Sequence, residues 1–276
     1  MIRLEDLPCF GSKINIAQIA AGHSHECYKV TSDGKTFFAK CFSRHSITAN
    51  AEVNASLVAA KQGIAPKVIY YDENWLVSSF IEQSIQETQQ KIEAGLVLMT
   101  KLHQTQVALP TLDIVKTIND LSQRGLLTKT QLSLISMVTE KLSSILIVKE
   151  LVPCHGDINF SNLLITGQSR YLVDFECACL ADREFDIAML IAINQLDITC
   201  LDDICQAYGK LSLFTDMPDN DLVMRYLLFC FLINGLWFLV RAKQNNDESL
   251  SFLAFEQFQG FDLLKFVPEQ LSVEMR

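Results

Sequence analysis

The sequence predicts an α+β fold in which strands fill the first third of the chain and helices most of the rest. Short segments between residues 13 and 80 have the length and composition of strands. From about residue 87 onward, apolar residues recur every three or four positions, which is typical of amphipathic helices. At 276 residues the chain is too long for one typical small domain, so we expect two lobes of unequal size.

The first part of the chain contains five strand-like segments, namely INIAQIA, ECYKVT, TFFAKCF, KVIYY and WLVSSF. Between the second and the third, an Asp33-Gly34 turn predicts a hairpin. Residues 46–62 are rich in alanine and end at Gly63, as in a helix with a glycine stop. We therefore expect an N-terminal lobe, residues 1–82, that consists of an antiparallel sheet and one helix.

The remaining residues, 83–276, are expected to form a mainly helical lobe. Within it, residues 226–240 (YLLFCFLINGLWFLV) carry no charge. This stretch is shorter than the roughly 20 apolar residues that a membrane-spanning helix needs. We interpret it as the central buried helix of the larger lobe and predict no membrane insertion.

The composition indicates which partners the protein can bind and in which cellular compartment it works. A net charge of −9 and the absence of a basic run argue against nucleic acid, because the surface repels phosphate. Nine scattered cysteines, mostly in apolar runs and without CxxC pairs, indicate buried reduced thiols. The first residues are acidic where a secretory signal would be apolar, so we expect a cytoplasmic protein.

The most informative segment is residues 151–176, in which polar motifs alternate with short apolar runs. The runs NLLIT and RYLVDF predict a hairpin that would bring Asp174 beside Asn162. One carboxylate and one amide oxygen suit Mg²⁺, which leaves its other positions to water and phosphates. Asp157, five residues before Asn162, stays free of the metal and is the candidate catalytic base for phosphoryl transfer to a hydroxyl.

These motifs, HGDxxxxN followed by VDFE, resemble those of the aminoglycoside phosphotransferase and choline kinase superfamily. They parallel the HRDxxxxN and DFG motifs of protein kinases, with Glu176 in place of the glycine. The resemblance implies a protein-kinase-like fold of two lobes, with ATP as co-substrate and Mg²⁺ as cofactor. It also implies that Asp186 braces the catalytic loop, which contains His155, through hydrogen bonds.

The resemblance further implies where the nucleotide binds. Lys40 and Glu52 match the lysine and helix carboxylate that hold the phosphates. The loop that includes His23 and Ser24 falls where the family places its phosphate-covering loop, although it contains only one glycine, Gly22. The segment WLVSSFIEQ resembles the hinge that binds adenine through its backbone, which implicates Ser79, Phe80 and Ile81.

The order and length of the segments are similar to bacterial thiamine kinases and to choline kinases of the LicA type. Both kinds of acceptor carry a quaternary nitrogen and a primary alcohol, and carboxylates and aromatic rings recognise such cations. Glu176 and Trp237 are therefore candidates for substrate binding. Two alternatives remain: the run ADREFDIA resembles aminoglycoside kinases, and a noncatalytic pseudokinase would keep the fold as a binding module. The oligomeric state is not predicted.

Overall fold

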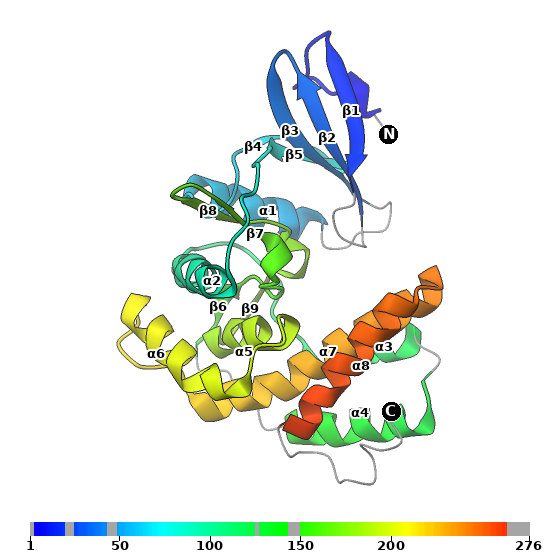
Figure 1. Cartoon of the computed structure of the whole chain (residues 1–276), viewed down its shortest axis with the longest axis vertical. Coiled ribbons are helices and arrows are strands. Elements are labelled where there is room, and N and C mark those ends of the chain that lie inside the picture. Colours follow the sequence, from blue (N-terminus) through cyan, green and yellow to red (C-terminus); the bar gives the residue numbers. More distant parts are fainter. Residues whose placement is uncertain (1–2, 20–24, 43–48, 125–126, 143–149, 264–276) are drawn as a thin grey trace. The chain divides into compact units, whose positions relative to one another are not determined.

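The computed structural model describes residues 3–19, 25–42, 49–124, 127–142 and 150–263 (Figure 1). The chain divides into two compact units. Unit 1 comprises Met1–Pro110 and Ser161–Ala178, and unit 2 comprises Thr111–Phe160 and Cys179–Arg276. Unit 1 holds a sheet and unit 2 is mainly helical, which confirms the α+β class. The division into lobes at residue 82 stays a prediction.

Unit 1 contains a five-stranded antiparallel sheet in the order β1-β2-β3-β5-β4 (Figure 1). The strands fall within the five predicted segments: β1 Ile14–Ile19, β2 Glu26–Ser32, β3 Lys35–Cys41, β4 Val68–Tyr71 and β5 Trp75–Ser79. In the turn between β2 and β3, Asp33 and Gly34 both have positive φ, 48° and 76°. Glycine adopts this conformation freely and aspartate more readily than most residues, so the Asp-Gly pair forms the predicted hairpin.

Helix α1, Ala49–Lys61, packs on the sheet face that carries Lys40. Leu76 lies opposite Lys40 across the β3-β5 pair, so both side chains point to this face. There Leu76 packs with Val53 of α1. Gly63 follows the helix with a φ of 69°, which confirms the predicted glycine stop. This packing brings Glu52, the neighbour of Val53, close to the sheet.

A second hairpin in unit 1 contains β7 and β8, with bounds Leu163–Thr166 and Ser169–Leu172. The segment that follows β5 is hydrogen-bonded to this hairpin. The Gln83 side chain donates a hydrogen bond to a β7 carbonyl (3.1 Å), and Ser84 donates from its backbone and its hydroxyl to another (3.0 and 2.8 Å). On the other strand, the Leu172 N–H donates to Ile64 O (2.8 Å). Helix α2, Thr88–His103, also packs on this hairpin.

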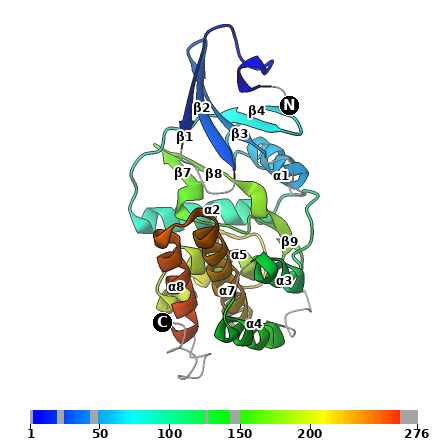
Figure 2. The same ribbon diagram turned by 90° about the vertical axis from the view of Figure 1, so that its right-hand side faces the viewer.

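Unit 2 is built around the long helix α7, Asn220–Asn245. The other helices and strands described in this unit include α3 Ile114–Arg124, α4 Lys129–Leu142, α5 Arg183–Ile193, α6 Leu201–Leu211, α8 Glu248–Leu263, β6 Val152–Cys154 and β9 Cys179–Ala181. Figure 2 shows α3, α4, α5 and α8 beside α7. Gly235 permits close approach to α8, since a Cβ there would lie 2.5 Å from the Phe258 ring.

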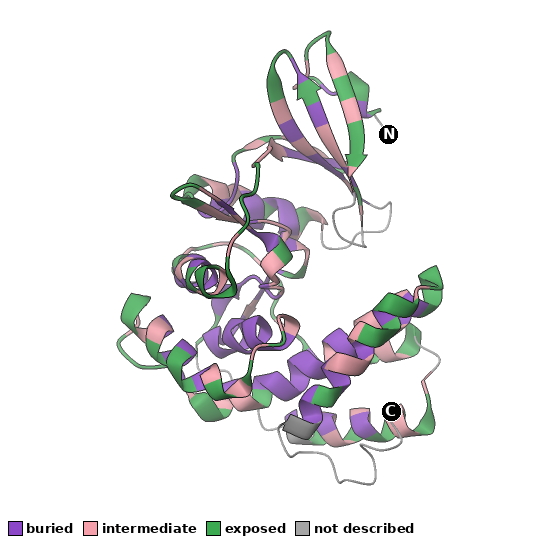
Figure 3. Ribbon diagram, in the orientation of Figure 1, coloured by how far each residue is buried: buried purple, intermediate pink, exposed green. Residues whose placement is uncertain are grey.

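Helix α7 is long and apolar enough to span a membrane by length and composition alone. However, 67% of its most apolar stretch is buried inside the structure, and Figure 3 shows α7 mostly in the buried colour. Helix α7 includes the uncharged stretch 226–240, so the predicted core helix is confirmed. The nine cysteines are thiols, as predicted, but the prediction that they are buried is wrong for four of them: Cys177 is exposed, and Cys9, Cys41 and Cys200 are partly exposed.

Candidate active site

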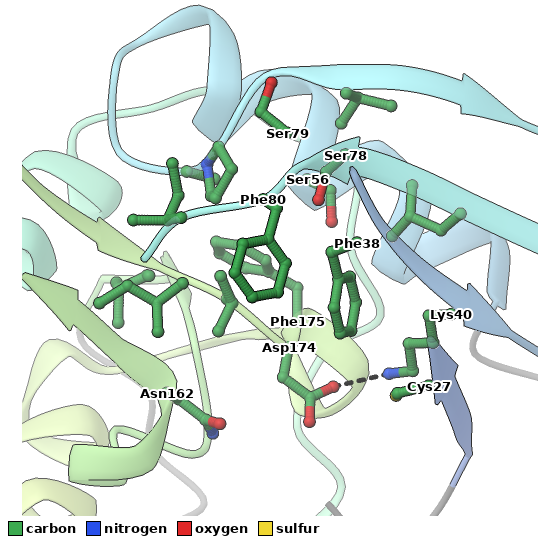
Figure 4. Close-up of a pocket in the computed structure, with 18 of the residues that line it drawn as sticks. Cys27, Phe38, Lys40, Ser56, Ser78, Ser79, Phe80, Asn162, Asp174 and Phe175 are labelled. Atoms are coloured by element: carbon green, nitrogen blue, oxygen red, sulfur yellow. Dashed lines mark hydrogen bonds and ion pairs between the residues drawn. The ribbon is translucent and has the colours of Figure 1, made fainter. Parts of the chain in front are cut away.

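Unit 1 contains a pocket of about 470 Å³, within the usual range for small-molecule sites. The sheet, α1, the segment after β5 and the β7-β8 hairpin all contribute to its lining. Figure 4 shows the aromatic rings of Phe38 and Phe80 among the lining residues, and a charged region around Lys40 and Asp174. The pocket can therefore hold a ligand with both an aromatic and an anionic part.

Lys40 is the centre of the charged region and is only 4% exposed. Its Nζ lies 2.7 Å from Glu52 Oε1, 2.6 Å from Asp174 Oδ1 and 3.4 Å from Glu176 Oε2. Burial lowers the pKa of Lys40, but the three carboxylates more than offset this and hold the pKa above its ordinary value. The ammonium group therefore stays protonated.

Glu52 is buried more deeply, with 1% of its surface exposed. Burial raises the pKa of Glu52, and Lys40 acts in the opposite direction. Its Oε1 accepts from Lys40, whereas its buried Oε2 has no hydrogen-bond partner among the residues that the structure describes. A buried carboxylate held by one cation depends on that cation, so Glu52 fixes Lys40 against α1.

Asn162 immediately precedes β7 and Asp174 follows β8, so both lie at the open end of the hairpin, and both line the pocket (Figure 4). The Val173 N–H donates to Asn162 O (3.0 Å), which extends the pairing of the hairpin by one step. Asp174 has a φ of 68°, an uncommon conformation for a residue other than glycine and one that is frequent at functional sites. The predicted hairpin is confirmed, and the ligand roles stay predictions.

The charges around Lys40 do not balance. Three carboxylates face one ammonium group, which leaves an excess of two negative charges if His25 is neutral. A divalent cation would compensate this excess, and the amide and carboxylate oxygens of Asn162 and Asp174 are ligands that Mg²⁺ accepts. The donor set therefore fits the magnesium ion that the sequence predicts.

Glu176 makes contacts that the sequence did not predict. Its Oε2 lies 3.2 Å from His25 Nε2 and 3.4 Å from Lys40 Nζ. His25 immediately precedes β2 and packs edge-on against Phe42. Ligand atoms of His25, Glu52 and Glu176 lie within 4.8 Å of one another, but the Lys40 ammonium contacts both carboxylates. His23 and Ser24, predicted to contact phosphate, lie outside the described residues.

The predicted hinge residues Ser79, Phe80 and Ile81 all line the pocket. Two of their amides are already bonded: the Ser79 N–H donates to Lys67 O (2.9 Å), and the Phe80 N–H donates to Thr36 O (3.2 Å). A base edge would have to use the Ile81 amide or the carbonyl groups of this segment.

Lys29 is a pocket residue that sequence reasoning missed. Its Nζ lies 4.4 Å from the centroid of the Phe80 ring, a cation–π distance. Its position on β2 gave no signal, because an isolated lysine on a half-exposed strand looks like an ordinary surface residue.

The predicted catalytic loop lies in unit 2, where the Asp186 side chain is hydrogen-bonded to its backbone. The carboxylate of Asp186, 0% exposed, accepts hydrogen bonds from the N–H groups of His155 and Gly156, both at 2.8 Å. Gly156 has a φ of 77°, a conformation that glycine adopts freely. The Asp157 N–H donates to His155 Nδ1 (3.3 Å). Asp186 therefore makes hydrogen bonds of the kind that the resemblance implies, and the role of this loop in catalysis stays a prediction.

Trp237, the second predicted substrate residue, lies on α7 in unit 2. Its ring packs against Phe238, with centroids 5.3 Å apart, and the Arg241 guanidinium lies 5.4 Å from its centroid. Glu176 belongs to unit 1, so a pocket shared by these two residues stays a prediction.

The buried Lys40–Glu52 pair makes a prediction for stability. Lys40→Met should lower the free energy of unfolding by about 3–5 kcal/mol, because it leaves Glu52 buried without its cation. The double variant Lys40→Met/Glu52→Met should recover most of this loss. Urea unfolding measures both, with Lys35→Met, at an exposed position of the same strand, as the control.

The loss of stability in Lys40→Met should also depend on pH. Without Lys40, the pKa of Glu52 in the folded state lies above its unfolded value, because the buried carboxylate has lost its cation. The loss in free energy of unfolding is therefore smallest at low pH, where Glu52 is protonated, and grows as pH rises. Equal unfolding midpoints for Lys40→Met and the parent at neutral pH would contradict this account.

Comparison with known proteins identifies the family. A model of the phosphotransferase enzyme family matches residues 15–220. Protein LicA of Haemophilus influenzae is 27% identical over 139 residues, which are 47% of this chain and 52% of that protein. The chain therefore spans about half the length of the curated relative that it matches.

Solved structures confirm the protein-kinase-like fold. A choline/ethanolamine kinase family protein from Mesorhizobium loti has a TM-score of 0.73 at 19% identity, covering 99% of this chain and 96% of the other. Choline kinase LicA from Streptococcus pneumoniae has a TM-score of 0.73 at 17% identity, covering 92% and 94%. LicA in complex with AMP also has a TM-score of 0.73, at 16% identity, covering 94% and 95%.

The match to the family model runs from the start of β1 to the start of α7 and takes in the HGDxxxxN and VDFE motifs. Because it covers well over half of the chain, this protein belongs to the phosphotransferase enzyme family.

Proposed function

We propose that this chain is a kinase that transfers the γ-phosphoryl group of ATP, bound with Mg²⁺, to the hydroxyl of a small cationic alcohol. The observation that carries the proposal is the charged region of the pocket. There Lys40 is held between Glu52 and Asp174 at 2.7 and 2.6 Å. Phosphoryl transfer needs a fixed cation for the phosphates and oxygen ligands for magnesium, and this arrangement offers both.

The nucleotide would lie in the unit 1 pocket, with its base toward Phe80 and Ile81 and its phosphates toward Lys40. The AMP complex of LicA supports a nucleotide site in this fold. Asn162 and Asp174 would hold the magnesium ion, which neutralises phosphate charge when bound. Lys40 would orient the phosphates, and Glu52 would keep the ammonium in place.

Asp157 is the proposed catalytic base. Only four residues separate it from Asn162 in the sequence, as in the motif of the family. In unit 2 its backbone follows two residues that are bonded to Asp186. Its carboxylate would orient the acceptor hydroxyl and accept its proton as the bond to phosphorus forms.

Choline is the favoured acceptor, because proteins described as choline kinases share this fold along nearly the whole chain. Thiamine has the same two chemical features, a quaternary nitrogen and a primary alcohol. For Glu176, recognition of the cation would compete with its contacts to Lys40 and His25. An aminoglycoside kinase is the alternative enzyme, and a pseudokinase the alternative without catalysis.

The acceptor is tested by measuring ADP release with Mg²⁺ and ATP in the presence of choline, ethanolamine, thiamine, homoserine or kanamycin. We expect turnover with choline, and a phosphorylated product of the corresponding mass. Turnover with kanamycin alone would favour the aminoglycoside alternative. If the protein binds ATP but turns over none of the five, the acceptor class is wrong and a pseudokinase becomes the better hypothesis.

The base is tested by Asp157→Asn. Loss of a general base typically costs roughly 10²- to 10⁴-fold in rate, so kcat should fall by about that factor while ATP still binds. Asp203→Asn, at an exposed position of α6, is the matched control and should leave kcat unchanged. An Asp157→Asn variant that retains kcat within about tenfold of the parent would remove Asp157 from this role.

A further inference from the structure

Asn194, the residue that follows α5, contacts the catalytic loop through both ends of its side-chain amide. Its Oδ1 accepts a hydrogen bond from the Phe160 N–H (2.8 Å). Its Nδ2 donates to Ile158 O (2.8 Å) and to Leu190 O of α5 (2.9 Å). One side chain therefore fixes two backbone groups of the loop and ties them to the helix. Nothing in the motifs of the sequence marked this residue.

Asp186 lies on α5, eight residues before Asn194, and accepts hydrogen bonds from the N–H groups of the two residues that precede Asp157. Helix α5 thus holds the loop on both sides of Asp157, through Asp186 before it and Asn194 after it. Ile158 adds a third anchor, because it is 0% exposed. The helix is itself a firm support, since residues 183–192 are all buried.

The chemistry at position 194 demands an amide. The side chain must accept from one N–H and donate to two carbonyl groups, and only an amide of this length does both here. Aspartate has nearly the same shape but would turn a carboxylate oxygen toward two carbonyl oxygens. Leucine keeps the volume and loses all three hydrogen bonds.

We infer that Asn194 is a positioning residue for Asp157: it holds the second half of the loop so that the carboxylate keeps the orientation that proton acceptance requires. The inference rests on the proposed function, in which Asp157 is the base. A shift of about 1 Å at a reacting group can cost on the order of 10²-fold in rate. Loss of this contact should therefore lower kcat without weakening binding of ATP.

The test compares Asn194→Asp and Asn194→Leu with the parent protein and with Asn220→Asp. The control makes the same chemical change at an exposed position of α7, where the side chain bonds Asp202. We expect kcat with choline to fall about 10- to 100-fold in both Asn194 variants, with KM for ATP and for choline within about twofold of the parent. The control should match the parent.

Amide hydrogen exchange of the peptide that contains residues 155–160 gives a readout that does not need turnover. Exchange at Phe160 should be faster in the Asn194 variants and unchanged in the control. If the parent is active and Asn194→Asp keeps kcat within twofold, the inference is overturned while the proposed function stands. If no alcohol is phosphorylated, the proposed function fails, and unchanged exchange in both Asn194 variants would overturn the inference as well.

If Asn194→Leu fails to fold, as judged by near-ultraviolet circular dichroism, the kinetic comparison uses Asn194→Asp and Asn194→Ser instead. Serine is neutral and polar and does not bring the negative charge of aspartate, but its single short hydroxyl cannot bond both Phe160 N and Ile158 O. A kcat of Asn194→Ser between those of the parent and Asn194→Asp would support the positioning role, whereas equal kcat in all three proteins would refute it.

Discussion

The contact between the Lys40 ammonium and three carboxylates is the constraint on which the pocket depends. It joins β3 to α1 through Glu52 and to the VDFE segment through Asp174 and Glu176. Removing charges from water is costly, and only close pairing compensates the cost. The lysine is therefore confined to one place, and one of its partners, Asp174, lies 134 residues away in the sequence. A phosphate group that enters the pocket meets a cation whose position is already fixed.

The proposed phosphate and metal site and the proposed catalytic base are held in place by different parts of the structure. In unit 1, the β7-β8 hairpin carries Asn162 and Asp174 and is bonded to the segment after β5 and to Ile64. In unit 2, α5 holds the loop that contains Asp157, with one polar side chain on each side of that residue. The groups proposed to bind phosphate and to accept the proton are thus held by different hydrogen-bond networks, so variants in one network should leave the other intact.

Local sequence patterns predicted much of this architecture. The strands, the Asp33-Gly34 hairpin, the glycine stop of α1 and the hairpin before Asp174 all follow from turn chemistry and from the spacing of apolar residues. Lys40 and Glu52 could be proposed as partners because the order of strand, helix and motif resembles a known family. Their contact at 2.7 Å agrees with that proposal.

Other parts of the site depend on contacts that no local pattern encodes. The pairing of His25 with Glu176 joins residues 151 positions apart, and Lys29 meets Phe80 only because β2 lies near the end of β5. Asn194 follows an apolar helix, where an asparagine is equally expected as a simple cap. Such residues are recognisable only when the fold brings their partners to them.

The most direct test of the account is the magnesium dependence of ATP binding, measured by titration calorimetry on the parent, Asp174→Asn and the exposed control Asp203→Asn. The account predicts that the parent and the control bind ATP at least about tenfold more tightly with Mg²⁺ than with a chelator. Asp174→Asn should lose most of that difference. Equal affinity with and without Mg²⁺ in the parent, or an undiminished difference in Asp174→Asn, would contradict it.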